Sequence, residues 1–321
     1  MFIDSHNRII DYLRISVIKE CNFRCLYCMP NIPFDYKFDD DLLSFDELFE
    51  LIKIFIDNGV KKIRITGGEP LLRPNLHELI YLIHTYNPNV DLALSTNAFL
   101  LKDQAKLLKQ SGLKRINISL DTLNSYKARK LYQKDVLDRI LEGLNEAIKL
   151  DFKIKINSVI LRAFNDDEII SLLEFAMQKQ IELRYIEFME NYHAYKALKG
   201  LNSKEILDKI KQKYKFAIHN TISNSPSKLY ILKNNYKFGI IDPHSTEFCT
   251  RCNRLRLDAS GSLIPCLYYD DALSLKDALK TRDINKIKHI LTQILKTKPK
   301  ENKWNIKNNQ ISNRAFYHTG G

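Results

Sequence analysis

The residues best suited to chemistry in this sequence are its six cysteines, which fall into two groups of three. The first group has the spacing C-x3-C-x2-C, and the second has the spacing C-x2-C-x13-C. In order along the chain they are Cys21, Cys25 and Cys28, then Cys249, Cys252 and Cys266. In a cytosolic chain of this size, clustered cysteines indicate metal binding rather than disulfides.

Three closely spaced thiolates can bind three irons of a four-iron cluster. Because such clusters usually take four cysteines, the fourth iron would be open to a small molecule. Zinc is the alternative, and structural zinc needs four closed ligands. The first triad has no nearby His or fourth Cys, which argues against zinc there. At the second triad, His244 or Asp270 would complete a tetrahedron, so zinc stays open at that site.

Two further segments are of types that bind ligands. One is the run Gly67-Gly68-Glu69-Pro70, which directly follows a predicted strand. The other is Asn253-Arg254-Leu255-Arg256, which directly follows Cys252. Arginines two residues apart in an extended segment point to the same face, as anion recognition requires.

These residues must be positioned by a regular framework, and the sequence predicts one of alternating strands and helices. Ser44 and Glu47 form a capping box for a first helix that Gly59 ends. Strands are predicted over residues 13–18, 61–66, 90–96, 115–121, 153–160 and 182–187. Helices are predicted over residues 76–86, 102–111, 136–150, 166–178 and 203–214. Strand–helix units in succession indicate an α/β fold with a parallel sheet.

The distinctive residues fall at the carboxyl ends of these strands. The first strand leads into Cys21, the second into the Gly-Gly-Glu-Pro run, and the last into Glu187 and Met189. In α/β barrels the chemistry lies at this end of the strands, so the sequence predicts one site there. After residue 200 the pattern changes, with a hairpin expected over residues 229–232 and 236–241 before the second triad.

The composition sets limits on the class of protein. With 321 residues, 45% apolar and 27% charged, the chain is expected to be globular rather than disordered or fibrous. It has no apolar run long enough for a membrane helix, and residues 1–12 show no secretory signal. We therefore expect a cytoplasmic protein that does not contact membranes.

The net charge of +12 is concentrated partly near the C-terminus. Residues 281–321 carry nine Lys or Arg against Asp283 and Glu301, a net charge of +7. Such a stretch can meet an anion, but no aromatic or Arg-rich recognition motif accompanies it. A solvated basic surface is therefore favoured, and no nucleic-acid partner is expected.

The motifs together resemble those of a known family. The C-x3-C-x2-C motif with Tyr27 before its last cysteine, and the Gly-Gly-Glu-Pro run, resemble radical S-adenosylmethionine enzymes. The second triad, the Arg-Leu-Arg run and the terminal Gly320-Gly321 resemble the GTP 3′,8-cyclase family of molybdenum cofactor biosynthesis over essentially the whole chain.

This resemblance implies a fold and a reaction. The fold is α/β, an incomplete TIM-type barrel of about six βα units over residues 1–220. A smaller α+β domain over residues 221–321 carries the second iron–sulfur cluster and the Gly-Gly tail. A 5′-deoxyadenosyl radical, made from S-adenosylmethionine, takes hydrogen from C3′ of GTP. The carbon radical then attacks C8 and gives (8S)-3′,8-cyclo-7,8-dihydroguanosine 5′-triphosphate.

The resemblance also implies roles for individual residues. The first triad binds a [4Fe–4S] cluster that chelates S-adenosylmethionine, and the second binds a [4Fe–4S] cluster that meets guanine. The expected contacts to S-adenosylmethionine are Tyr27, Gly68, Ser119 and Met189. The expected contacts to GTP are Arg14, Arg64, Ser95, Lys155, Arg254, Leu255 and Arg256. Gly320 and Gly321 are expected to reach toward the active site, and no catalytic residue is expected beyond these ligands.

Partners follow from the same resemblance: a reducing electron donor, and cyclic pyranopterin monophosphate synthase as the acceptor of the product. The chain is expected to be a monomer or a homodimer. It departs from the family pattern at Ala98, where glycine is usual, and at Phe316 and Thr319, where Met and Ile are usual. None of these changes removes a charged or ligating group.

Simpler interpretations stay open for single residues. Lys155 would ordinarily lie on the solvent face of its strand, and Arg14 or Arg64 would pair with a structural carboxylate if buried. A strand-end serine such as Ser95 or Ser119 commonly caps a helix, and Met189 would be core. For the whole chain, the alternatives are a radical enzyme with a different substrate, such as a peptide, and a basic RNA-binding protein with structural zinc.

Overall fold

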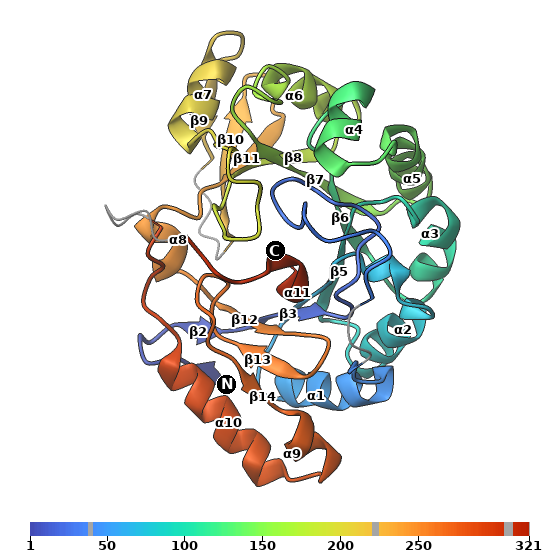
Figure 1. The fold of residues 1–321 in the computed structure, drawn as a ribbon, viewed down its shortest axis with the longest axis vertical. Helices are drawn as coiled ribbons and strands as arrows, with labels where there is room; N and C mark the ends of the chain where they lie inside the picture. Colours follow the sequence, from blue (N-terminus) through green and yellow to red (C-terminus); the bar gives the residue numbers. More distant parts are fainter. Residues whose placement is uncertain (38–40, 220–224, 305–310, 321) are drawn as a thin grey trace.

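The computed structural model describes residues 1–37, 41–219, 225–304 and 311–320. Its centre is a twelve-stranded sheet with the order β14-β13-β12-β3-β4-β5-β6-β7-β8-β11-β10-β9. The strands from β12 through β3–β8 to β11 are parallel, and the pairs beyond them on both edges are antiparallel. The sheet curves around an interior into which the C-terminal segment enters (Figure 1). This is the α/β, partial barrel-like fold that the sequence predicts.

The parallel strands alternate between an apolar outer face and a polar inner face. In β4 (Lys62–Thr66), Ile63 and Ile65 are buried in the hydrophobic core, whereas Lys62, Arg64 and Thr66 line the interior. Alternation follows from the pleat of a strand, which sends successive side chains to opposite faces. The other parallel strands are β3 (Tyr12–Ser16), β5 (Asp91–Thr96), β6 (Arg115–Ser119), β7 (Lys153–Ile160), β8 (Glu182–Glu187), β11 (Lys237–Ile241) and β12 (Arg254–Leu257).

Helices cover the outer face of the curved sheet (Figure 1). They are α1 (Phe45–Asp57), α2 (Leu76–Tyr86), α3 (Leu101–Gln110), α4 (Ser125–Tyr132), α5 (Leu137–Lys149) and α6 (Ile169–Gln178). The predicted capping box at the start of α1 is confirmed, because Glu47 N donates to Ser44 Oγ and Ser44 N donates to Glu47 Oε2. No helix in the described part of the chain is long and apolar enough to cross a membrane.

The region after residue 200 joins both edges of the same sheet. It contributes α7 (Ser203–Lys211), β9 (Phe216–Ile218), β10 (Ser227–Leu232) and β11, of which β10 and β11 form the predicted hairpin and β11 pairs in parallel with β8. At the opposite edge β12 pairs in parallel with β3, and β13 (Ser262–Ile264) and β14 (Leu273–Ser274) follow it. The C-terminal third therefore extends the barrel wall on both sides. A division of the chain at residue 220 stays a prediction.

One long helix was not among those predicted: α10 (Ile284–Thr297). Asp283 caps it by accepting a hydrogen bond from Lys286 N, and its buried side chains recur at helical spacing. They are Ile287, Ile290, Leu291, Ile294 and Leu295. Both signals are present in the sequence, so local pattern alone was sufficient to find this helix. The remaining short elements are η1 (Pro70–Leu72), α8 (Thr246–Thr250), α9 (Lys276–Lys280), α11 (Phe316–Thr319) and the β1–β2 pair (Phe2–Ile3, Ile9–Ile10).

The departure at Ala98 has a structural consequence. Ala98 follows β5 in a left-handed conformation, with φ +63°, and is fully buried. A left-handed backbone costs a residue with a side chain roughly 1–2 kcal/mol, a cost that glycine avoids. The Ala98 amide donates to Thr96 Oγ1, which holds the turn in place. The chain therefore keeps this turn at an energetic cost.

Candidate active site

A cavity of about 480 Å³ lies inside the curved sheet. It is lined by all three cysteines of the first triad and by Cys249 and Cys266 of the second. The segments that follow β3, β4, β5, β6 and β8 meet at one end of the cavity, because parallel strands all have their carboxyl ends on the same side of the sheet. The structure therefore brings both triads and the strand ends to one site.

The first triad follows β3 in a loop that bonds to its neighbours through the main chain. Arg24 N and Leu26 N donate to the carbonyls of Tyr132 and Leu131, at the end of α4. Two groups donate to Cys21 Sγ: Phe23 N at 3.4 Å and Asn97 Nδ2 at 3.9 Å. These contacts fix the loop and leave the three thiols facing the cavity.

The three cysteines of this triad become thiolates readily only when a cation is bound beside them. Burial and, to a lesser extent, the nearby Glu69 carboxylate raise the pKa of Cys21 to about 12. Burial and the neighbouring Cys21 also raise the pKa of Cys28 to about 12, and the pKa of Cys25 rises for the same reasons. Three thiolates together are therefore unfavourable without positive charge, which iron would supply on binding them.

The run after β4 approaches the cysteine loop closely. Gly68 N donates to Ile18 O at 2.8 Å, and Glu69 N donates to Glu20 O at 2.7 Å. A Cβ at Gly68 would lie 2.2 Å from the main-chain oxygen of Glu20, so only glycine fits there. The Glu69 carboxylate accepts hydrogen bonds from Thr96 Oγ1 and Asn97 N at 2.6 and 2.7 Å. This run therefore locks the ends of β3, β4 and β5 together.

A buried carboxyl group after β6 connects two tyrosines at the cavity wall. The Tyr27 hydroxyl donates to Asp121 Oδ2 at 2.7 Å, and the Tyr132 hydroxyl donates to the same oxygen at 3.2 Å. Val159 N donates to Asp121 Oδ1 at 2.7 Å. Burial raises the pKa of Asp121 to about 6. Asp121 therefore ties the cysteine loop, through Tyr27, to the ends of β6 and β7.

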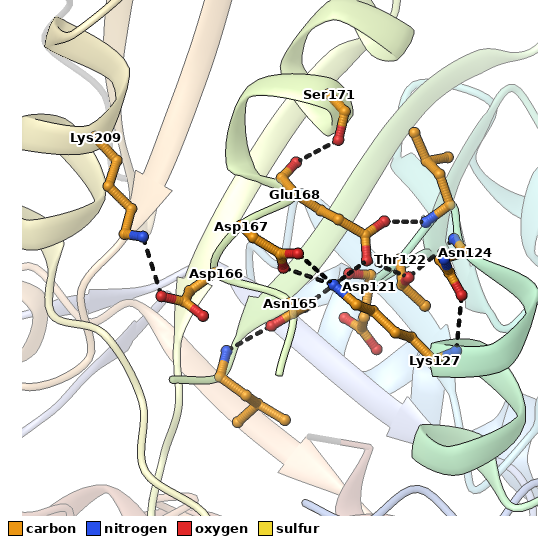
Figure 2. A network of polar contacts seen from close by, with 12 residues as sticks. Asp121, Thr122, Asn124, Lys127, Asn165, Asp166, Asp167, Glu168, Ser171 and Lys209 are labelled. Atoms are coloured by element: carbon orange, nitrogen blue, oxygen red, sulfur yellow. Dashed lines mark hydrogen bonds and ion pairs between the residues drawn. The ribbon is translucent and has the colours of Figure 1, made fainter. Parts of the chain in front are cut away.

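A polar network behind Asp121 holds that strand end in position (Figure 2). Asn165 Nδ2 donates to Asp121 O and Val159 O, and Asn165 Oδ1 accepts from Leu161 N. Glu168 accepts from Thr122 Oγ1 at 2.6 Å and from the next main-chain amide along the strand end. The loop after β7 thus braces the loop after β6.

The inner face of the sheet carries rows of polar side chains set by strand register. One row runs across five strands through Arg256, Arg14, Arg64, Ala93 and Arg115. A second row runs through Ser95, Asn117, Lys155 and Glu182. Because residues in register lie on the same face, these rows gather the predicted GTP contacts on one wall. Arg14, Arg64, Ser95, Lys155, Arg254 and Arg256 all line the cavity.

Several of these cations already have carboxylate partners. The Lys155 ammonium lies 2.9 Å from both Glu182 oxygens, and Arg184 Nε lies 2.7 Å from Glu182 Oε1. Lys155 thus lines the cavity and is paired with Glu182, rather than lying on the solvent face of its strand as its simpler interpretation had it. Arg64 differs, because it is 5% exposed and its Nε and Nη1 have no hydrogen-bond partner among the described residues. It is a buried cation directed into a cavity, ready to receive an anion.

The second triad lies where α8 meets β12. Cys249 Sγ accepts a hydrogen bond from Asn302 Nδ2 at 3.2 Å. Although burial disfavours the Cys252 thiolate, the guanidinium of Arg254 and the ammonium of Lys298 lower the pKa of Cys252 to about 5. Arg254 lies over the Phe248 ring at 4.4 Å. Arg254, which lines the cavity, therefore stabilises the thiolate form of Cys252.

The described residues form no site for a single zinc ion at the second triad. Among the described residues, no group of three His, Cys, Asp or Glu side chains stands close enough to hold one metal ion. His244 Nε2 instead lies 3.0 Å from Phe188 O, and its ring contacts Trp304. An iron–sulfur cluster distributes its cysteines over several irons, so free cysteines that do not converge on one point fit a cluster better.

The C-terminal tail enters the cavity region as expected for Gly320. The Gly320 carbonyl accepts from Arg14 Nη2 at 2.7 Å and from Arg256 Nη1 at 2.8 Å. Arg256 Nη1 also donates to Thr319 O at 3.2 Å. Phe316 and Thr319, two of the departures from the family pattern, are both buried. Gly321 lies outside the described residues.

One predicted GTP contact, Leu255, does not line the cavity. Leu255 lies between two cavity-lining arginines on β12, so the pleat turns its side chain outward into the hydrophobic core, where it is 1% exposed. A contact between Leu255 and GTP would therefore involve its main chain, and it stays a prediction. Tyr27, Gly68, Ser119 and Met189 all line the cavity near the first triad.

The polar residues of the cavity wall that were not predicted from the sequence include Tyr12, Lys62, Arg115 and Arg184. Tyr12 and Lys62 each lie two positions before a predicted arginine, so strand alternation was the signal that could have found them. Although burial alone would raise it, the nearby guanidiniums, Arg64 and Arg14 foremost, lower the pKa of Tyr12 to about 8. The wall is therefore more basic than the predicted set suggests.

Comparison with known proteins places this geometry in context. The family model described as Radical SAM superfamily matches residues 15–176, and the model described as Molybdenum Cofactor Synthesis C matches residues 181–304. Proteins named GTP 3′,8-cyclase from Campylobacter jejuni (serotype O:6) and Helicobacter pylori (strain J99) are 56% and 53% identical to this chain over 321 residues, which is 100% of both chains in each case.

Solved structures show the same fold at low sequence identity. Streptococcus suis SuiB bound to S-adenosylmethionine has a TM-score of 0.60 and 19% identity, over 86% of this chain and 64% of its own. His6-tagged anSMEcpe with bound AdoMet has a TM-score of 0.55 and 15% identity, over 95% of this chain and 90% of its own. At these identities the likeness concerns the fold alone.

Proposed function

Because this chain belongs to the GTP 3′,8-cyclase family of radical S-adenosylmethionine enzymes, we propose that the cavity inside its sheet binds S-adenosylmethionine and GTP together. The reaction gives (8S)-3′,8-cyclo-7,8-dihydroguanosine 5′-triphosphate in the first step of molybdenum cofactor biosynthesis. The observation that supports this assignment is the convergence of both cysteine triads and a basic wall on one cavity.

Cys21, Cys25 and Cys28 would hold the first [4Fe–4S] cluster. When bound, that cluster supplies the electron for reductive cleavage of S-adenosylmethionine. The chain's own contribution is to orient that molecule. Gly68 lets the main chain approach without a side chain, while Tyr27 is held by Asp121 at the cavity wall. Ser119 and Met189 line the same region and would complete the contacts.

The basic wall would hold the triphosphate of GTP. In the described part of the chain, Nε and Nη1 of Arg64 have no hydrogen-bond partner, and phosphate oxygens are acceptors whose geometry a guanidinium matches. Cys249, Cys252 and Cys266 would hold the second cluster, which would bind the guanine base. Fixing the base and the phosphates at opposite ends orients the ribose between them, and intramolecular ring closure depends on such orientation. Enclosure by the sheet would also keep water away from a radical.

The test of this function follows one hydrogen atom. The iron-reconstituted protein is incubated anaerobically with reductant, S-adenosylmethionine and GTP deuterated at C3′, and the products are analysed by mass spectrometry. We expect deuterium in 5′-deoxyadenosine together with an isomer of GTP. If 5′-deoxyadenosine forms without deuterium, the substrate is not GTP. If none forms although both clusters are present, the assignment to radical chemistry is wrong.

The tail should contribute to turnover through its contact with two arginines. A Gly320→Ala variant places a Cβ 2.0 Å from Thr66 Cγ2, at a residue with φ +64°. The strain of roughly 1–2 kcal/mol should displace the tail from Arg14 and Arg256 and lower kcat about tenfold, since about 1.4 kcal/mol corresponds to a factor of ten. The change in kcat is measured as the rate at which the cyclic product forms.

Gly59→Ala is the matched control for this variant. Gly59 also has positive φ, +96°, but its added Cβ would meet nothing closer than 3.7 Å, and it lies at the end of α1. It should lose stability to a similar degree and keep its kcat. Equal loss of kcat in both variants would show that the tail acts only through stability.

Other assignments rest on the same family membership. We propose that residues 221–321 act as a functional unit that carries the second cluster and the tail. The chain would work in the cytoplasm as a monomer or homodimer. It would take electrons from a reducing donor and pass its product to cyclic pyranopterin monophosphate synthase.

A further inference from the structure

A second cavity, of about 430 Å³, lies at the amino ends of β5, β6 and β7. It is lined by His84 from the end of α2 and by Lys114 and Lys153 from the starts of the two later strands. Two of its lining residues, Asp91 and Arg115, also line the cavity that we assign to GTP. These two side chains therefore stand between the two cavities.

Asp91 and Arg115 form an ion pair at this boundary. Arg115 Nη1 lies 2.8 Å from Asp91 Oδ2, and the side chains of Arg115 and Asp91 are 28% and 31% exposed. Asp91 is the first residue of β5 and Arg115 is the first residue of β6, and these strands are neighbours in the sheet. Their positions are therefore fixed by the strand ends and not by mobile loops.

The cations of the basic wall and the Asp91 carboxylate have opposite effects on a phosphate chain. On the active-site side, Lys62 is the register partner of Asp91, and Arg64 lies two residues further along the same strand. Its Nε and Nη1 have no hydrogen-bond partner among the described residues. These cations attract phosphate, whereas the Asp91 carboxylate repels it. A chain of phosphates that extends from Arg64 toward the strand starts would meet this carboxylate next.

We propose that the Asp91–Arg115 ion pair is the floor of the GTP cavity and determines how many phosphates the substrate carries. The inference rests on the proposed function, because it takes the phosphates to lie against the basic wall. A fourth phosphate would have to displace the pair to enter the second cavity. Lys114 and Lys153 line that cavity, so it accommodates an anion once the carboxylate is gone.

The experiment compares the affinities of the holoenzyme for GTP and for guanosine 5′-tetraphosphate by calorimetry. In Asp91→Asn, the preference for GTP over the tetraphosphate should fall at least fivefold. In Arg115→Gln, the carboxylate loses its counterion, so the preference should rise instead. Asp91→Glu keeps the charge and should keep the preference of the wild type.

Asp103→Asn is the control for loss of one paired carboxylate. Asp103 pairs with Arg139 on the outer helices and is 57% exposed, so this variant should bind both nucleotides as the wild type does. If the wild type binds GTP but Asp91→Asn keeps the wild-type preference for GTP over the tetraphosphate, the proposed role of the ion pair is wrong and the proposed function is unaffected. A wild type that binds neither nucleotide overturns the proposed function itself.

The preference for GTP should fall in Asp91→Asn and rise in Arg115→Gln. These opposite changes distinguish a specific effect on the preference from a general loss of folding. A variant that is merely destabilised loses affinity for both nucleotides in proportion, and its ratio does not move. Thermal unfolding of each variant identifies that case. If Asp91→Asn fails to fold, the Arg115→Gln ratio decides alone, and an unchanged or lowered preference there contradicts the proposal.

Discussion

A Cys25→Ser variant should form no detectable 5′-deoxyadenosine. Cys25 lies between the thiols of Cys21 and Cys28, and desolvation together with those neighbours raises its pKa well above the ordinary value. A thiolate is unfavourable there without bound metal. We therefore expect the Cys25 thiolate to serve as a cluster ligand, and its replacement to affect iron binding more than folding. Loss of an outer-shell partner typically costs a metal site about 10–100-fold, and loss of a direct ligand should cost more. Iron content and the yield of 5′-deoxyadenosine measure the effect.

Cys252→Ser is the informative comparison for this variant. It removes a ligand of the second triad, so about half of the iron should be lost. S-adenosylmethionine cleavage should persist while cyclic product disappears. Both variants should unfold near the wild-type temperature in the metal-free form, since serine closely matches the thiol in size. If Cys25→Ser retains its iron and its cleavage activity, the first triad is not the cluster site.

An Arg64→Ala variant should bind GTP about a hundredfold more weakly. Two guanidinium nitrogens of Arg64 are buried without a partner in the described part of the chain. Each hydrogen bond between charged groups is worth about 1.5–3 kcal/mol, and about 2.8 kcal/mol corresponds to a factor of a hundred. The loss of affinity is measured as the change in the dissociation constant of GTP, determined by calorimetry. Arg64→Lys keeps the charge but loses the fork of donors, so about a tenfold loss is expected.

Stability separates a binding role of Arg64 from a structural one. A buried cation without a partner destabilises the protein free of nucleotide, so Arg64→Ala should unfold at an equal or higher denaturant concentration than the wild type. Arg162→Ala is the surface control, because Arg162 is 51% exposed and pairs with Glu205. It should leave GTP affinity unchanged. Weaker folding of Arg64→Ala with unchanged GTP affinity would assign Arg64 to the scaffold.

Much of the framework could be predicted from short stretches of sequence. The capping box at Ser44 and the strand–helix alternation each depend on residues only a few positions apart. The cysteine spacings, the Gly-Gly-Glu-Pro run and the two arginines of β12 are equally local. For this reason the α/β class and the strand ends follow from the sequence, and most of the residues predicted for the site line the cavity. The helix α10 also carries local signals, in its Asp283 cap and its apolar spacing, although it was not predicted.

Other features depend on which strands become neighbours, and the tertiary structure alone decides these. The pairing of β12 with β3 joins residues about 240 positions apart and sets Arg256 beside Arg14, where both bind the Gly320 carbonyl. Lys155 and Arg64 have similar strand contexts in the sequence. The structure pairs the first with Glu182 and leaves the second open to the cavity.

The physical reason is the range over which each property is determined. Backbone conformation and the face of a strand follow from steric contacts within a few residues, so the sequence determines them directly. The partner of a buried charge depends on side chains that only long-range packing brings within hydrogen-bond distance. The sequence of this protein thus determined which groups are available for chemistry, and its tertiary structure decided which of them remain free to bind a substrate.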